Sequence, residues 1–180
     1  MLRDFIKFLN QIKPDVITGW NTKFFDIPYI VNRVERLLGE EQVRLISPWK
    51  IVKGGKVNIK GRDQQYYDIF GMASLDYMDL YRKFTYTVQE SYALNHIANV
   101  ELGEKKLSHD EYENFATFYK TDWQKFVEYN IRDVELVSML EDKLGLIDLC
   151  LTMAYDFRVN YEDVYSQVRC WDMLIYNHPV

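Results

Sequence analysis

A short apolar run between a proline and a polar loop fixes the first part of the expected fold. Residues 16–20 read Val-Ile-Thr-Gly-Trp. Because β-branched residues favour strands, we predict a buried strand there. Pro14 separates this strand from an amphipathic helix predicted over residues 2–12. A second helix is expected over residues 28–38, with a proline at its start. The chain therefore opens with helix, strand, loop and helix.

The composition is that of one folded domain. The chain has 180 residues, of which 48% are hydrophobic and 16% aromatic, enough for a real core. It has no apolar run long enough to span a bilayer and no signal-peptide pattern. Cys150 and Cys170 fit a reducing compartment and have no metal-binding spacing. The net charge of -5 argues against broad coating of nucleic acid but does not exclude a nuclease, whose acidic site meets DNA through cations.

A β-hairpin is predicted over residues 49–60, with Gly54 and Gly55 as its two-residue turn. It is rich in basic residues with no acidic residue between them, namely Lys50, Lys53, Lys56, Lys60 and Arg62. Two interpretations stay open: a positive patch that contacts phosphates, or a lysine-protected strand edge that avoids aggregation.

The remaining pattern is mostly helical. A strand is expected over residues 65–70, and helices over residues 91–99 and 166–176. The longest helix should begin at Thr121, with this hydroxyl as N-cap in a capping box, and should bend near Gly145. Asp76 is interpreted as a helix cap or surface carboxylate.

Two acidic positions are candidates for chemistry. Asp26 follows the predicted strand and two aromatic residues, so it could be a helix N-cap or a metal ligand at a strand end. Tyr129 and Asp133 are four residues apart, and on a helix both side chains would project from one face. Such a pair could hold a cation and orient a water, yet the same spacing is common on solvated helix faces.

These segments resemble the second and third exonuclease motifs of family B DNA polymerases, most closely those of T-even-type bacteriophages. The second motif is matched by Asn21-x-x-x-Phe25-Asp26, and the third by Tyr129-x-x-x-Asp133. Further similar segments lie in the same order along the chain, at residues 75–81, 91–94, 102–106 and 153–177. The ordered set is more specific than any one motif.

The resemblance implies an α/β fold, a ribonuclease H-like 3′–5′ exonuclease domain truncated at its N-terminal strands and carrying an inserted β-hairpin. Residues 1–150 would be the partial exonuclease domain, and residues 151–180 the start of the connection towards the polymerase palm. The first exonuclease motif, an Asp-x-Glu on a strand, is expected upstream of residue 1. Glu135 should not replace its glutamate beside Asp133, because residues two apart on a helix point in different directions.

The resemblance also assigns roles. Family members hydrolyse the primer 3′ end with two Mg²⁺ or Mn²⁺ ions. By similarity, Asp133 would bind the first metal, Asp26 would serve the second, and Tyr129 would position the attacking water. The expected DNA-binding residues are Asn21, Phe24, Phe25, Lys50, Lys53, Lys56 and Lys60, with the two phenylalanines as stacking surfaces.

We therefore expect a fragment of a phage-type family B DNA-directed DNA polymerase that acts on primer-terminal DNA. Without the first motif it should bind metal weakly and hydrolyse little on its own. The alternative is a non-catalytic DNA-binding or assembly subunit of a split polymerase. Expected partners are single-stranded 3′ ends and primer–template DNA, the remaining polymerase segments, and a second copy covering the truncated sheet. The expected location is the cytoplasm of a phage-infected bacterium, without a membrane.

Overall fold

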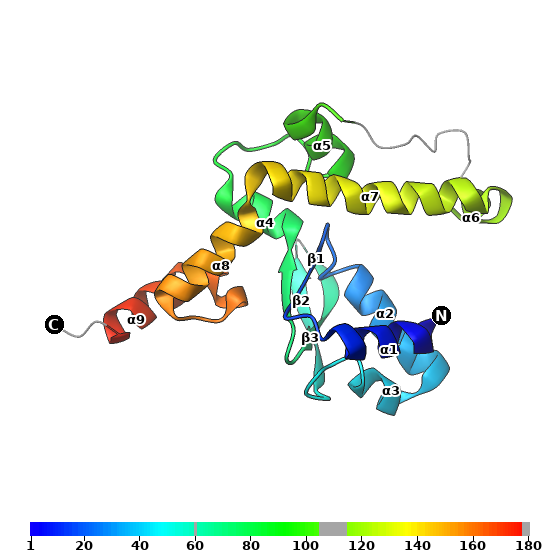
Figure 1. Cartoon of the computed structure of the whole chain (residues 1–180), viewed down its shortest axis with the longest axis horizontal. Coiled ribbons are helices and arrows are strands. Elements are labelled where there is room, and N and C mark those ends of the chain that lie inside the picture. Colours follow the sequence, from blue (N-terminus) through cyan, green and yellow to red (C-terminus); the bar gives the residue numbers. More distant parts are fainter. Residues whose placement is uncertain (60, 105–114, 178–180) are drawn as a thin grey trace.

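Two small sheets lie at the centre of the molecule, with helices around them (Figure 1). The computed structural model describes residues 1–59, 61–104 and 115–177. Helices α1 (Leu2–Ile12), α2 (Asp26–Leu38) and α3 (Glu40–Arg44) lie together near the N-terminus. The later helices are α4 (Tyr77–Phe84), α5 (Leu94–Leu102), α6 (Phe115–Thr121), α7 (Trp123–Leu144), α8 (Leu146–Phe157), the 3-10 helix η1 (Tyr161–Tyr165) and α9 (Gln167–Asn177). The chain is thus a mixed α/β structure, as predicted.

The first sheet joins segments that are far apart in the sequence. Strand β1 (Val16–Gly19) pairs in parallel with β4 (Ala73–Asp76), with Val16 opposite Ala73 and Gly19 opposite Asp76. The predicted strand at residues 16–20 is therefore confirmed, one residue shorter than expected. In a parallel pair both carboxyl ends lie at the same edge. The loop after β1 and the start of α4 consequently meet there.

The second sheet is a hairpin whose predicted turn was wrong. Strands β2 (Val52–Ile59) and β3 (Arg62–Ile69) pair antiparallel, with Ile59 opposite Arg62 as the last pair, and Gly61 before β3 has a φ of 79°. Gly54 and Gly55 lie inside β2, opposite Tyr67 and Tyr66. A Cβ on Gly55 would lie 2.5 Å from Cζ of Tyr66. The glycines therefore leave room for cross-strand tyrosine rings.

One hydrophobic cluster joins the N-terminal helices to the hairpin. Its buried members are Ile6, Leu9, Ile27, Val31, Val34, Val43 and Ile46, and Val52, Tyr67 and Ile69 of the hairpin pack against it. The predicted helix over residues 2–12 is confirmed. Phe8 and Ile12, which share its predicted apolar face, remain more than half exposed. This cluster holds α2, whose first residue is Asp26, against the hairpin.

A second cluster attaches α7 to the parallel sheet. Its fully buried members include Leu75, Tyr77, Leu80, Tyr81, Ile97, Leu136, Leu140 and Cys150. Since Cys150 of α8 belongs to the same cluster, the predicted domain boundary after residue 150 falls inside a helix that packs on α4. That boundary stays a prediction.

The long helix begins one residue later than predicted. Asp122, not Thr121, is the N-cap of α7, and its side chain accepts a hydrogen bond from the Lys125 N–H at 3.0 Å. Thr121 instead ends α6, where its hydroxyl donates to the Thr117 carbonyl. α7 ends at Leu144, and its C-cap Gly145 has a left-handed φ of 58°. No helix within the described ranges is long and apolar enough to cross a membrane.

We predict that Gly55→Ala lowers the free energy of unfolding by about 1 kcal/mol. Overpacking costs about 1–3 kcal/mol, and the lower flexibility of the unfolded chain offsets part of this cost. Because the added methyl group would collide with Tyr66, the same substitution in a Tyr66→Ala background should cost little. Urea unfolding of the four proteins measures both effects. An equal cost in both backgrounds would show that the ring is not the obstacle.

Candidate active site at the edge of the parallel sheet

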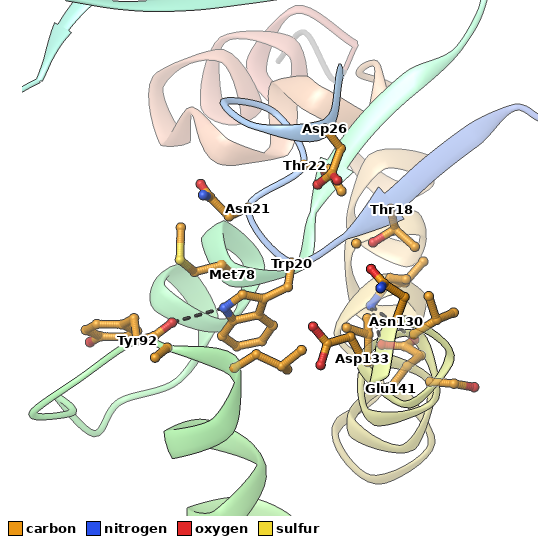
Figure 2. A pocket seen from close by; sticks show the side chains of 17 residues that line it. Thr18, Trp20, Asn21, Thr22, Asp26, Met78, Tyr92, Asn130, Asp133 and Glu141 are labelled. Atoms are coloured by element: carbon orange, nitrogen blue, oxygen red, sulfur yellow. Dashed lines mark hydrogen bonds between the residues drawn. The ribbon is translucent and has the colours of Figure 1, made fainter. Parts of the chain in front are cut away.

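A cavity of about 720 Å³ lies where the carboxyl ends of β1 and β4 meet α7 (Figure 2). One wall comes from the end of β1 and the loop after it, and includes Thr18, Trp20, Asn21, Thr22 and Asp26. The facing wall is one side of α7, with Asn130, Asp133, Val134, Val137, Ser138 and Glu141. Met78 of α4 and residues 92–94 line the cavity as well. The structure thus brings both predicted metal ligands, Asp26 and Asp133, to one cavity.

Asp26 is the first residue of α2, and the helix N-cap is Phe25. Because Phe25 has the N-cap position, the interpretation of Asp26 as the N-cap was wrong. Its side chain is open to solvent, but neighbouring protein atoms displace part of its water, and this desolvation raises the pKa of the carboxyl. The negative charge of Asp76 also raises this pKa. A nearby cation would stabilise the ionised carboxylate of Asp26 in this environment.

The loop before Asp26 is anchored by aromatic packing. The indole N–H of Trp20 donates to the carbonyl of Tyr92 at 3.0 Å (Figure 2). Its ring lies 6.3 Å from those of Tyr77 and Tyr81. The side-chain oxygen of Thr22 is buried without a hydrogen-bond partner within the described part of the chain. Thr22 thus places an unsatisfied polar atom just beneath the cavity wall.

The two residues of the predicted Tyr129–Asp133 pair have different environments. Asp133 is half-buried and lines the cavity. Tyr129 is 8% exposed and is not one of the cavity's lining residues; its ring packs edge-on against Phe118 at a centroid distance of 6.0 Å. The side of α7 that lines the cavity includes Asn130, which the sequence reasoning did not single out. The water-positioning role of Tyr129 stays a prediction.

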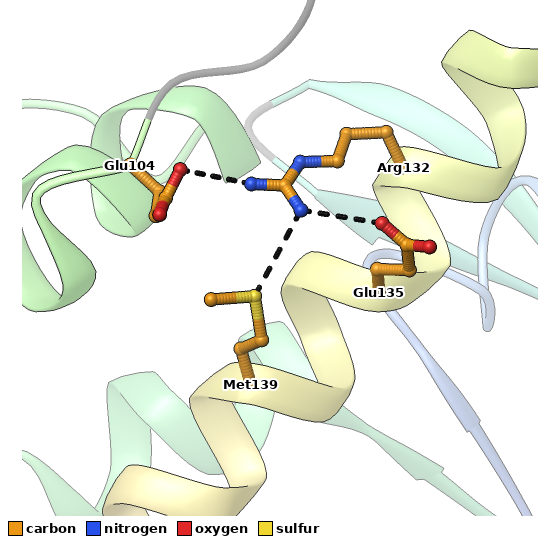
Figure 3. Close-up of polar contacts among 4 residues, drawn as sticks. All are labelled: Glu104, Arg132, Glu135 and Met139. Carbon is orange, nitrogen blue, oxygen red and sulfur yellow. Dashed lines mark hydrogen bonds and ion pairs between the residues drawn. The ribbon is translucent and has the colours of Figure 1, made fainter.

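Arg132 connects α7 to the segment after α5 (Figure 3). Its guanidinium contacts Glu104 at 2.9 Å and Glu135 at 3.2 Å, and it lies 4.0 Å from the sulfur of Met139. Glu135 is exposed and is not among the residues lining the cavity. The structure therefore gives Glu135 a place in this ion-pair network, away from the lining set that contains Asp133.

Glu141 is a further cavity residue that the sequence did not reveal. Its carboxylate accepts hydrogen bonds from the backbone N–H groups of Ile147 and Asp148, at the start of α8. It also contributes, after burial, to the raised pKa of the Tyr77 hydroxyl. These contacts give Glu141 a structural role at the α7–α8 junction. The sequence signal that could have found Glu141 is its position seven residues, or about two helical turns, after Val134, which places both on one side of α7.

The predicted DNA-contacting aromatic residues lie beside the cavity. Phe25 is 67% exposed, whereas Phe24 is half-buried, and neither belongs to the buried core. The Lys23 ammonium lies 5.9 Å from the Phe24 ring and 5.8 Å from the Tyr66 ring of β3, within cation–π range. Asn21 lines the cavity with a left-handed φ of 63°. Of the two phenylalanines, Phe25 thus has the more accessible ring for stacking.

The basic residues of the hairpin do not form one face. Lys53 and Lys56 are three residues apart in β2, so their side chains point to opposite faces of the sheet. Lys53 pairs across the strands with Asp68 and lies 5.2 Å from the Phe70 ring. Lys50 is exposed before the hairpin, and Lys60 lies outside the described residues, as do residues 105 and 106 of the similar segment at 102–106. Phosphate binding by these lysines stays a prediction.

The described residues provide only some of the ligands that a divalent metal ion needs. Carboxylate oxygens suit Mg²⁺ and Mn²⁺, and Asp26 and Asp133 provide two such groups at one cavity. Among residues 1–59, 61–104 and 115–177, however, no three His, Cys, Asp or Glu side chains come close enough to hold a metal ion. These residues alone therefore do not make a two-metal site.

Sequence comparisons relate this chain to polymerases. Residues 1–97 match the family described as DNA polymerase family B, exonuclease domain. The chain is 37% identical over 177 residues to the DNA-directed DNA polymerase of Enterobacteria phage T4 and 33% identical over 177 residues to that of Escherichia phage RB69. Each match covers 98% of this chain, but 20% and 19% of the relatives. A DNA polymerase delta catalytic subunit from Candida albicans is 30% identical over 176 residues, covering 91% of this chain and 15% of that protein.

We predict that Asp26→Asn stabilises the fold at neutral pH. When folding raises the pKa of an aspartate, its ionised form destabilises the folded state. This destabilisation grows as the pH rises above the pKa of the unfolded chain, about 3.9. The increase in unfolding free energy on replacing Asp26 by a neutral amide should therefore be small near pH 4 and larger near pH 7. Urea unfolding over this range measures it, with the exposed Asp142→Asn as control. A pH-independent loss of stability would contradict the desolvated environment of Asp26.

Proposed function

The chain belongs to the family B DNA polymerases and carries part of their exonuclease domain, and from this we propose that it contributes two carboxylate motifs to a proofreading 3′–5′ exonuclease site. It spans about a fifth of the length of its phage relatives. The observation that carries the proposal is that Asp26 and Asp133, which are far apart in the sequence, line one cavity at the edge of a parallel strand pair.

The fold we propose is ribonuclease H-like. In open α/β sheets, ligands bind in the crevice outside the carboxyl ends of parallel strands. The cavity has this position relative to β1 and β4, and α7 covers it. The described sheet has two parallel strands, and the proposal implies that further strands continue it in the complete domain.

The proposed reaction is hydrolysis of the last phosphodiester bond of a primer. A water oxygen bonds to phosphorus, the bond from phosphorus to the 3′ oxygen of the preceding nucleotide breaks, and that oxygen takes a proton. A nucleoside monophosphate leaves. Bound Mg²⁺ or Mn²⁺ supplies water activation and stabilises the leaving oxygen in such reactions. Asp26 and Asp133 would each supply a carboxylate oxygen to these ions, and additional ligands would come from outside the described residues.

The neighbouring residues would hold the DNA end. Phe25 presents an exposed ring on which an unpaired base can stack. Asn21 and Thr22 lie on the same loop and both line the cavity. Phe24, Tyr129 and the hairpin lysines would act nearby rather than on the cavity wall itself.

The proposed setting is a larger polymerase. Its partners would be primer–template DNA with a single-stranded 3′ end and the other polymerase segments, and its location the cytoplasm of a phage-infected bacterium. The second candidate is a non-catalytic DNA-binding or assembly subunit. It is favoured because, within the described ranges, no group of three His, Cys, Asp or Glu side chains is arranged to hold a metal ion.

The test is binding of short single-stranded DNA, measured by fluorescence anisotropy with Mn²⁺ or with a chelator. Removing carboxylates makes the chain less negative, so Asp26→Ala/Asp133→Ala should bind DNA equally well or better in chelator. In Mn²⁺ the same variant should bind about tenfold more weakly, equivalent to about 1.4 kcal/mol, because its carboxylates no longer hold the bridging cation.

Asp142→Ala is the matched control, since Asp142 is an exposed carboxylate of α7 that does not line the cavity. It should leave Mn²⁺-dependent binding unchanged. Digestion of 3′-labelled DNA, followed in parallel, separates the two candidates: cleavage that needs Asp26 and Asp133 supports a nuclease, and binding alone supports the second candidate. DNA binding that does not depend on Mn²⁺ or on the two carboxylates would refute the proposal.

A further inference from the structure

We propose that Asp76 is a positioning residue that holds the loop carrying Asp26 in its working shape. This inference rests on the proposed function of the cavity, because it assigns a second residue to the same site. Asp76 is only 2% exposed, does not line the cavity, and ends strand β4. It would act through the backbone of the loop, without touching DNA or metal.

Three backbone N–H groups donate to this one carboxylate. Oδ1 of Asp76 accepts from Met78 at 3.0 Å and from Asn21 at 3.0 Å, and Oδ2 accepts from Lys23 at 3.0 Å. The Met78 bond is the N-cap of α4. The other two bonds cross to the loop between β1 and α2. A single buried side chain therefore joins a helix start to the functional loop.

The loop between β1 and α2 needs such an acceptor, because its backbone shape leaves the N–H groups of Asn21 and Lys23 without a backbone partner among the described residues. Asn21 has a left-handed φ of 63°, which a residue other than glycine adopts at some energetic cost. A buried N–H without an acceptor would add a further penalty. The loop then closes on itself: the Ile27 N–H donates to the Thr22 carbonyl, across the residues that precede Asp26. Holding Asn21 and Lys23 thus constrains both Thr22 and Asp26.

Strand pairing brings Asp76 to the loop. Asp76 is the register partner of Gly19, the last residue before the turn. A Cβ on Gly19 would lie 2.4 Å from a methyl carbon of Thr22, which shows how closely the loop folds back over the strand end. On the far side, the Tyr165 hydroxyl donates to the Asp76 carbonyl at 3.4 Å. Tyr165 therefore holds the backbone of Asp76, while its carboxylate holds the loop.

A simple helix cap is the competing explanation, and Asp76→Ser separates it from the positioning role. Serine is a good N-cap, so the Met78 bond can be kept, but its shorter side chain has one oxygen and cannot also reach Lys23. Asp76→Asn provides a second variant of nearly the same shape. If its oxygen stays with Asn21 and Met78, its amide group faces the Lys23 N–H, donor against donor.

The experiment is amide hydrogen exchange of the full chain, combined with the Mn²⁺-dependent DNA-binding assay. In both variants the Lys23 amide should exchange at least about tenfold faster, as expected when a hydrogen bond to a charged group is lost. In Asp76→Ser the Met78 amide should stay protected. DNA binding in Mn²⁺ should weaken, while binding in chelator should not.

Asp142→Asn is the control, because Asp142 is an exposed carboxylate of α7 that does not line the cavity; it should change neither readout. Unchanged Lys23 exchange in the Asp76 variants would overturn the inference, and so would faster exchange with unaltered Mn²⁺-dependent binding. If the unaltered chain fails to bind DNA in Mn²⁺, the proposed function fails instead, and with it the positioning role at that site; Lys23 exchange then still reports whether Asp76 holds the loop.

Discussion

The parallel pairing of β1 with β4, in the register that sets Gly19 opposite Asp76, is the constraint on which the site depends. It brings the loop after β1 and the first turn of α4 to one edge of the sheet. The buried side chains of Leu75 and Tyr77, on either side of Asp76, then pack in one cluster with Leu136 and Leu140 of α7. The same core that closes over the strands consequently places Asp133 across from Asp26.

Side chains of the hairpin pack against the elements at this edge of the sheet. Gly55 leaves space for Tyr66, and the Tyr66 ring lies beside the ammonium group of Lys23 in the loop between β1 and α2. Tyr67, on the other face, packs into the N-terminal cluster and donates its hydroxyl to the side chain of Asn32 in α2. Each tyrosine thus connects the hairpin to a different element of the site, and both contacts depend on glycines in the facing strand.

The sequence predicted the parts of the fold that depend on local pattern. Helices at residues 2–12 and 28–38 and the strand at 16–20 follow from apolar spacing and β-branched residues, and the structure has them with small shifts at the ends. The Gly54–Gly55 turn failed because a glycine pair suits a turn and also suits a strand facing bulky rings. Only the cross-strand register distinguishes these cases, and register is not local information.

For the candidate site, too, the sequence indicated only those residues that belong to a local motif. Asp26 and Asp133 came from motif resemblance, and they line one cavity. Asp76 and Glu141 were not assigned to the site, since a buried carboxylate that accepts from backbone N–H groups leaves no distinctive spacing in the sequence. Tyr129 shows a different limit, because its four-residue spacing from Asp133 did not predict that its ring packs against Phe118.

A Mn²⁺ titration of the side-chain carboxyl NMR signals of Asp26 and Asp133 would show whether the two residues form one site. If they share a cation, both signals should broaden over the same range of Mn²⁺ concentration, and Asp133→Ala should reduce the broadening at Asp26. Broadening of Asp26 that is unaffected by Asp133→Ala, or that occurs over a separate concentration range, would contradict a shared cation site.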